Sequence, residues 1–100
     1  MKTYRPLPPF ITIHNSPIDG LGMFATDNID GNFTIGITHI RDDRFENGYS
    51  RTPLGGFFNH SETPNCKVVE DGDFIKLVTL REIVKGEEIT AKYTFYDPTI

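Results

Sequence analysis

Apolar and polar residues alternate over short stretches along most of the chain, which is the pattern of half-buried β-strands. The pattern predicts strands at residues 10–14, 23–26, 33–38, 66–70, 74–80 and 89–96. Between two of these strands stands Asp71-Gly72-Asp73, a sequence typical of a hairpin turn. No segment keeps a helical period for ten residues, and residues 42–53 are expected to hold at most a short helix or a loop. The predicted fold class is therefore mainly β.

The length of 100 residues fits one folded domain. Pro6, Pro8 and Pro9 disfavour a helix at the start, so residues 1–9 are expected to form an extended arm, followed by a single domain over residues 10–100. Hydrophobic residues make up 37% of the chain and charged residues 24%, which excludes disordered and low-complexity classes.

Charge and cysteine content narrow the class of protein. The net charge is −4 and no basic run occurs, so we expect no direct nucleic acid partner. The single cysteine, Cys66, cannot form an internal disulfide, which favours a reducing compartment. The chain contains neither a signal-peptide pattern nor 18 consecutive apolar residues. We therefore expect no membrane partner and a soluble, intracellular protein of the cytoplasm or nucleus.

Two glycines in the segment Asp19–Ala25 bracket Leu21. Gly20 and Gly22 permit a sharp turn and a close approach of the backbone to a ligand. A dinucleotide-binding loop would need a third glycine and a following helix, and neither is present. Taken alone, the segment is typical of a hairpin turn.

A second segment, residues 55–66, joins two aromatic residues to a polar run. Phe57 and Phe58 precede Asn59-His60-Ser61, and Pro64-Asn65-Cys66 follows. His60 and Cys66 could belong to a metal site or to a thiol nucleophile with its base, or His60 could be a hydrogen-bonded structural residue. The other histidines are scattered, so no metal site is predicted.

A third segment, residues 86–96, reads by itself as a turn followed by an aromatic strand. In this order, the three segments together resemble the SET-domain family of S-adenosylmethionine-dependent protein-lysine methyltransferases. The resemblance rests on residues 16–26, on Phe57–Ser61 with Pro64-Asn65-Cys66, and on Gly86–Tyr93. It runs from about Phe10 to Tyr96 and implies a fold of several small β-sheets around a C-terminal pseudo-knot.

The resemblance also implies roles for particular residues. S-adenosylmethionine would contact Gly20, Leu21, Gly22, Met23, Phe58, Asn59 and His60. Tyr93 would be the catalytic residue, placed where the methyl group passes to the lysine. The channel for the substrate lysine would include Tyr49, Phe58, Ala91, Phe95 and Tyr96.

The sequence departs from the family pattern after Tyr93. Many members carry a cysteine-rich zinc cluster there, whereas seven residues without cysteine follow here. We therefore expect a homodimer, in which each subunit helps to close the other's site. The expected partner is a histone or other basic protein with an accessible lysine. An alternative is a non-catalytic module of the same fold that binds cofactor or a peptide, and a second is a small structural β-protein without cofactor.

Overall fold

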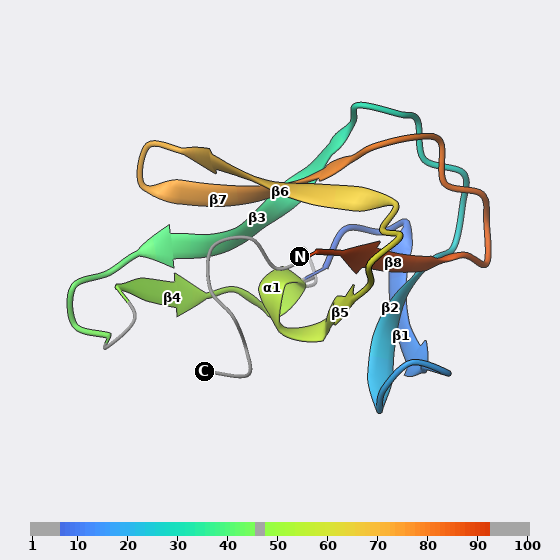
Figure 1. Cartoon of the computed structure of the whole chain (residues 1–100), viewed down its shortest axis with the longest axis horizontal. Coiled ribbons are helices and arrows are strands. Elements are labelled where there is room, and N and C mark those ends of the chain that lie inside the picture. The colour runs from blue at the N-terminus through green and yellow to red at the C-terminus, as the bar shows by residue number, and fades with distance from the viewer. Residues whose placement is uncertain (1–6, 46–47, 93–100) are drawn as a thin grey trace, which may run out of the picture.

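The computed structural model describes residues 7–45 and 48–92, and this part of the chain is mainly β, as predicted (Figure 1). One short helix interrupts the strands. In chain order the elements are β1 (Ile11–Asn15), β2 (Leu21–Ala25), β3 (Thr34–Arg41), β4 (Tyr49–Arg51), α1 (Pro53–Phe57), β5 (Asn59–His60), β6 (Cys66–Asp71), β7 (Phe74–Thr79) and β8 (Glu88–Ala91). Among the described residues, no helix is long and apolar enough to cross a membrane.

The strand β8 joins the two parts of the sheet. The strand order is β1-β2-β8-β6-β7-β3-β4, and β5 pairs with β8 outside this path. β8 is antiparallel to β2 and parallel to both β5 and β6. In Figure 1, β8 accordingly lies between the β1–β2 hairpin and the sheet that contains β6 and β7. Segments from the start, middle and end of the chain thus meet on one strand.

The hairpin predicted at Asp71-Gly72-Asp73 is confirmed. Asp71 pairs with Phe74 across a two-residue loop, and β6 stays paired with β7 back to Cys66. Gly72 has a φ of 60°, a value that glycine adopts without strain.

The hydrophobic core lies around β2, β7 and β8. Met23, Leu77 and Ile89 contribute one fully buried side chain from each of these strands. Ile29 and Ile83 pair outside the named strands through backbone hydrogen bonds of 2.7 and 2.8 Å. These bonds join the turn after β2 to the turn before β8.

The segment that lacked a pattern holds more structure than expected. It contains β4, and α1 begins at Pro53, where Thr52 caps the helix by accepting a 3.3 Å hydrogen bond from the Gly55 amide. The Thr52 hydroxyl also donates to the Ile37 carbonyl at 2.6 Å, which fixes the helix against β3. A side chain at Gly55 would overlap the Thr38 carbonyl oxygen, so glycine is required there.

Parts of three sequence predictions lie outside the described residues. The extended arm was predicted over residues 1–9, and the described chain begins at Leu7. The final strand was predicted at residues 89–96; β8 begins at Glu88 and is described to Ala91. The segment expected to complete the pseudo-knot includes residues 93–100, which the structure does not describe.

Candidate functional site

Three distant segments meet at the side chain of Asn59. Its amide nitrogen lies 2.8 Å from Glu88 Oε2 and 3.1 Å from Ser16 Oγ. The same nitrogen lies 3.2 Å from the Asp19 carbonyl oxygen and 3.4 Å from that of Leu21. Because all four neighbours offer lone pairs, they fix which end of the amide faces them. One side chain therefore holds together β5, β8 and the turn between β1 and β2, residues 16–21, which we call the opening turn.

Ser16 and Glu88 form the second half of this network. The Ser16 hydroxyl lies 2.8 Å from both carboxylate oxygens of Glu88 and can donate to either. Its oxygen also accepts from the Ile18 amide at 3.0 Å. A side chain at Gly22 would overlap Glu88 Oε2, so this glycine provides the space that the carboxylate occupies.

Asn65 holds β8 from its other side. Its amide nitrogen donates to the Glu88 carbonyl at 2.8 Å, and its amide oxygen accepts from the Thr90 backbone N–H at 2.9 Å. The side chain is almost completely buried and occupies the hydrogen-bonding position of a neighbouring strand. Asn59 and Asn65, which both belong to the segment of residues 55–66, therefore both fix β8.

The outer face of the opening turn is accessible to a ligand. Ile18 and Leu21 are 51% and 50% exposed, so their apolar side chains are open to solvent. Gly20 has a φ of 45° and no atom within 4 Å of the position a Cβ would take. The turn therefore presents backbone and apolar surface beside the half-buried Asn59 and His60.

His60 pairs with Ala91 on β8 and takes part in a chain of polar contacts at the surface. Its Nε2 lies 3.2 Å from Glu62 Oε1, and Glu62 Oε2 lies 3.1 Å from Lys92 Nζ. The hydrogen bond from His60, followed by that from Lys92, holds the pKa of the Glu62 carboxyl below its ordinary value. Lys92 is thereby drawn toward the Asn59-His60 segment.

The structure gathers some predicted site residues and separates others. Gly20, Leu21 and Gly22 lie with Asn59, and His60 is adjacent. The predicted site residues that are instead buried beneath this surface, as members of the core, are Met23, Phe58 and Ala91. Tyr93, Phe95 and Tyr96 lie outside the described residues.

Tyr49 lies away from this cluster. Its hydroxyl donates to Glu70 Oε1 at 3.3 Å, and the Arg41 guanidinium lies 5.6 Å from its ring centroid. Cys66, at the start of β6, pairs with Ala91 of β8. Glu70 lies four residues further along β6, and the rise of a strand puts it about 13 Å from Cys66. The structure therefore does not bring Tyr49 to the residues around Asn59.

Sequence reasoning assigned no role to Ser16, Glu88 or Asn65, although all three stand in the motifs. The Ser-Pro pair carries a local signal, because a serine there commonly accepts from an amide two residues on, as Ser16 does from Ile18. Glu88 carries no such signal, since its partner Ser16 is 72 residues away in the sequence.

The thiol-nucleophile interpretation is not supported. Cys66 is fully buried, and burial raises the pKa of its thiol to about 12. A thiol in this state is protonated at neutral pH and is a poor nucleophile. Within residues 7–45 and 48–92, no group of three or more His, Cys, Asp or Glu side chains could hold a metal ion.

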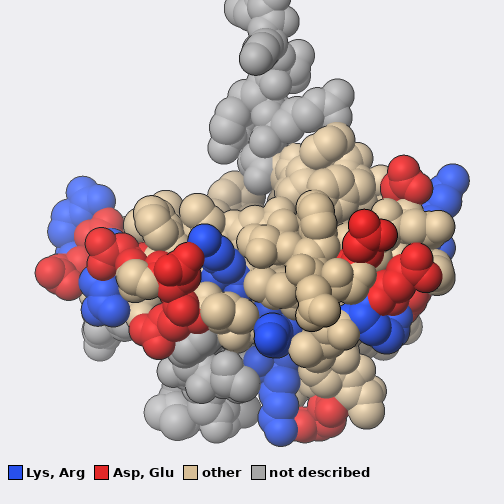
Figure 2. Space-filling model, turned by 90° about the horizontal axis from the view of Figure 1, so that it is seen from above, with Lys and Arg blue, Asp and Glu red and all other residues tan. Residues whose placement is uncertain are grey.

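Surface charges are mixed rather than gathered. On the face seen in Figure 2, Lys and Arg side chains lie among Asp and Glu at both ends, and the surface between them is mostly uncharged but carries further Lys or Arg side chains. Described ion pairs such as Arg41–Asp73 and Lys76–Asp71, 3.3 and 2.7 Å, account for part of this mixing. On this face the charges of the described residues therefore form no patch of a single sign.

Comparisons with known families and curated proteins show what the chain is similar to. The family model of the SET domain matches residues 32–94. Two SET and MYND domain-containing proteins of Dictyostelium discoideum are each 38% identical to the chain, over 53 and 50 residues. These matches cover 53% and 50% of this chain but 14% and 12% of the relatives, so the chain corresponds to a small part of their length.

Solved structures share the fold. A candidate histone methyltransferase of Plasmodium falciparum superimposes with a TM-score of 0.68 at 23% identity, covering 88% of this chain and 96% of the other. The methyltransferase domain of human PR domain-containing protein 2 gives 0.71 at 20% identity, covering 94% and 84%. The family model spans more than half of the chain, and the fold agrees with it. The protein therefore belongs to the SET-domain family.

Proposed function

We propose that this domain transfers a methyl group from S-adenosylmethionine to the ε-amine of a lysine in a protein substrate. The three family motifs lie far apart in the sequence but meet at the side chain of Asn59. This meeting is the observation that carries the proposal. Family membership supports methyl transfer, since similar folds are named as a candidate histone methyltransferase and as a methyltransferase domain.

The chemistry of the opening turn suits this cofactor. Carbonyl oxygens of Asp19 and Leu21 and the carboxylate of Glu88 surround Asn59, so the region is rich in partial negative charge. Such a region favours a sulfonium cation, and the exposed Ile18 and Leu21 offer apolar surface to an adenosine. When bound, S-adenosylmethionine supplies an electrophilic methyl group.

Residues of this chain would hold the cofactor in two ways. Gly20, Leu21 and Gly22 would contact it mainly through backbone, and Asn59 and His60 would border it. Met23 and Phe58 would support this surface from the core rather than touch solvent.

In this transfer the lysine nitrogen would form a bond to the methyl carbon as the carbon–sulfur bond breaks, and the product ammonium would release its proton to water. The attacking amine must be neutral, and an apolar channel favours that form by desolvation. We assign orientation of the amine to the Tyr93 hydroxyl and exclusion of water to Phe95 and Tyr96. Alignment of the two reactants would supply most of the rate.

The test is transfer of labelled methyl from S-adenosylmethionine to basic proteins, histones included. Tyr93→Phe is expected to lower turnover by roughly 100-fold, the scale of one positioned hydroxyl, while cofactor affinity by calorimetry stays unchanged. Tyr49→Phe is the matched control, because it removes a hydroxyl that bonds to Glu70 instead.

The outcomes separate the candidate functions. Cofactor binding without transfer to any protein would favour the non-catalytic module. Failure to bind the cofactor would refute the proposal. Equal losses in the two tyrosine variants would remove Tyr93 from its assigned role.

A further inference from the structure

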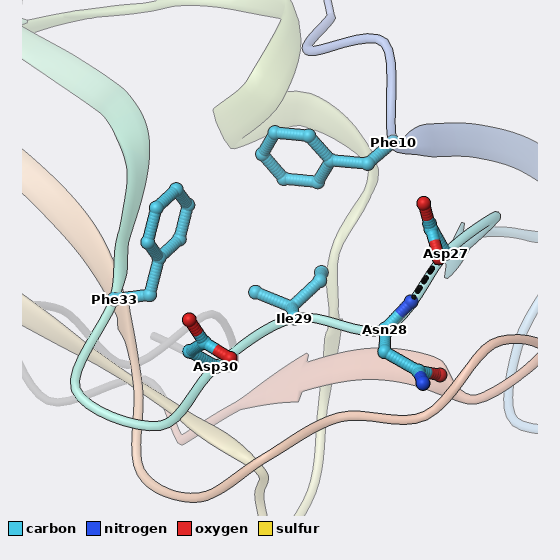
Figure 3. Close-up of a pocket in the computed structure, with 6 residues that line it drawn as sticks. All are labelled: Phe10, Asp27, Asn28, Ile29, Asp30 and Phe33. Carbon is cyan, nitrogen blue, oxygen red and sulfur yellow. Dashed lines mark hydrogen bonds between the residues drawn. The ribbon is translucent and has the colours of Figure 1, made fainter.

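A pocket of about 190 Å³ opens between the turn after β2 and the residue that precedes β1. Figure 3 shows the residues that line it: Phe10, Asp27, Asn28, Ile29, Asp30 and Phe33. It lies at the opposite end of the β1–β2 hairpin from Asn59, because Ile11 pairs with Ala25 near the pocket whereas Asn15 pairs with Leu21 near Asn59. The pocket is therefore separate from the site described above.

Two aromatic rings form adjoining walls of the pocket. The centroids of Phe10 and Phe33 are 5.8 Å apart and the ring planes meet at 73°, so the rings make a corner. In Figure 3, Ile29 lies beside the two rings, and its side chain is only 4% exposed. The base is thus apolar, and aromatic faces attract a cation placed near them.

Two carboxylates flank the same space. Asp27 and Asp30 are both exposed, and Figure 3 shows them on either side of Ile29. Asp27 Oδ1 accepts a 2.8 Å hydrogen bond from the Asn28 amide, which leaves its charge in place. Neither carboxylate forms an ion pair with any described residue. The pocket therefore combines aromatic walls with uncompensated negative charge.

The loop that carries these groups is held in place before any ligand arrives. Asn28 Oδ1 accepts from the Lys85 amide at 2.9 Å, and the Asp30 carbonyl accepts from the Thr79 hydroxyl at 2.6 Å. Ile29 is fixed by its paired hydrogen bonds with Ile83. A preformed site loses little entropy on binding, which favours even a small ligand.

We propose that this pocket binds the side chain of a lysine in a protein partner, with the ammonium group against the rings and between the carboxylates. The volume suits one side chain, because a cavity of about 150 Å³ holds benzene whereas small-molecule sites usually exceed about 300 Å³. The corner between the rings suits a compact ammonium better than a planar guanidinium. The assignment is independent of methyl transfer and provides a second contact for a basic polypeptide.

The test is a titration followed by NMR, with the full chain and no S-adenosylmethionine. The probes are blocked Gly-Lys-Gly, Gly-norleucine-Gly and Gly-Arg-Gly peptides, which differ only in the central side chain. The lysine peptide is expected to shift the amide signals of residues 27–33 saturably, and to bind roughly tenfold or more tightly than the norleucine peptide because of the charge. Added salt should weaken this binding, since the carboxylates are exposed.

The double variant D27N/D30N is expected to lower lysine-peptide affinity by roughly tenfold or more. Asparagine retains the oxygen that accepts from the Asn28 amide, so the loop should keep its fold. The control D43N/D73N changes net charge equally beyond the other end of β3 and should leave affinity unchanged. Equal binding of the norleucine peptide, tighter binding of the arginine peptide, or unchanged affinity in D27N/D30N would each overturn the proposal.

Discussion

Asn59→Asp tests whether the network around Asn59 holds the site together. The change replaces the amide nitrogen by oxygen and alters almost nothing in shape. It removes the donor that serves the carboxylate of Glu88, the hydroxyl of Ser16 and two carbonyls of the opening turn. It also puts a second negative charge where a nitrogen stands 2.8 Å from Glu88 Oε2.

The lost hydrogen bond and the added charge repulsion each have an expected magnitude. A hydrogen bond to a charged group stabilises a fold by about 1.5–3 kcal/mol. Two like charges about 4 Å apart near a protein surface repel by about 4 kcal/mol. The free energy of unfolding should therefore fall by several kcal/mol at pH 8, a large share of the roughly 5–15 kcal/mol of a typical domain.

The loss in the free energy of unfolding of Asn59→Asp should depend on pH. Repulsion from Glu88 raises the pKa of the introduced carboxyl in the folded state above its unfolded value near 4. A raised pKa favours folding at low pH, and that contribution is lost as pH rises through the folded pKa. The variant should therefore come closest to the parent near pH 4 and differ most at pH 8.

The assay is urea unfolding followed by circular dichroism, with parent and variant compared at each pH. Asn32→Asp is the matched control, because Asn32 is exposed and its φ of 54° suits asparagine and aspartate alike. A loss below about 1 kcal/mol at pH 8, the scale of a neutral hydrogen bond, would refute the reasoning. A deficit that does not change with pH would show that repulsion is not its cause.

Three further predictions concern the same strand, the buried thiol and the assembly. Asn65→Ala should lower the free energy of unfolding by about 2–4 kcal/mol in urea, because it leaves the Glu88 carbonyl and the Thr90 N–H of β8 without their partner; the exposed Asn15→Ala should not. Cys66, with its pKa raised to about 12, should react with iodoacetamide at pH 8 at least about 100-fold more slowly in the folded protein than in urea, and equal rates would contradict its burial. Light scattering of the purified chain should give twice the monomer mass, whereas a fully active monomer would contradict the expected homodimer.

The strands were predictable where their signals are local. β6 and β7 alternate in polarity on either side of Asp71-Gly72-Asp73, and the hairpin formed there as expected. β3 extends to Arg41, beyond the predicted end at residue 38. Thr38 and His39 are both buried, and the Thr38 hydroxyl donates to the Ile75 carbonyl at 3.1 Å. Buried polar residues with internal partners break the alternation on which the prediction depended.

The helix and the shortest strands could not be predicted from the periodicity of apolar residues. α1 spans five residues and β4 three, which is too short to display a period. Thr52 before Pro53 nevertheless is a recognisable start of a helix, since threonine is a good N-cap and proline fits the first turn. Attention to that pair would have predicted a helix start at the end of the unpatterned segment.

The site was predictable as a set of motifs but not as a network of contacts. Resemblance to the family grouped Gly20, Gly22 and Asn59, and the structure brings them together. The partners that join them, Ser16 and Glu88, are 72 residues apart, and no local rule relates them. The space for Glu88 comes from the missing side chain of Gly22, which sequence reasoning had explained by backbone freedom alone.

This network constrains how the site can use its motif residues. The described contacts of Asn65 engage its amide nitrogen and oxygen with β8, and those of Glu88 engage both carboxylate oxygens with Ser16 or Asn59. Side chains engaged in this way build the site rather than supply its reactive groups. Ligand contacts at this corner must then come mainly from the backbone and apolar surface of the opening turn. Substitution of the asparagines should accordingly lower ligand affinity and fold stability together, whereas Leu21→Ala, which trims a half-exposed side chain, should lower affinity with little change in stability.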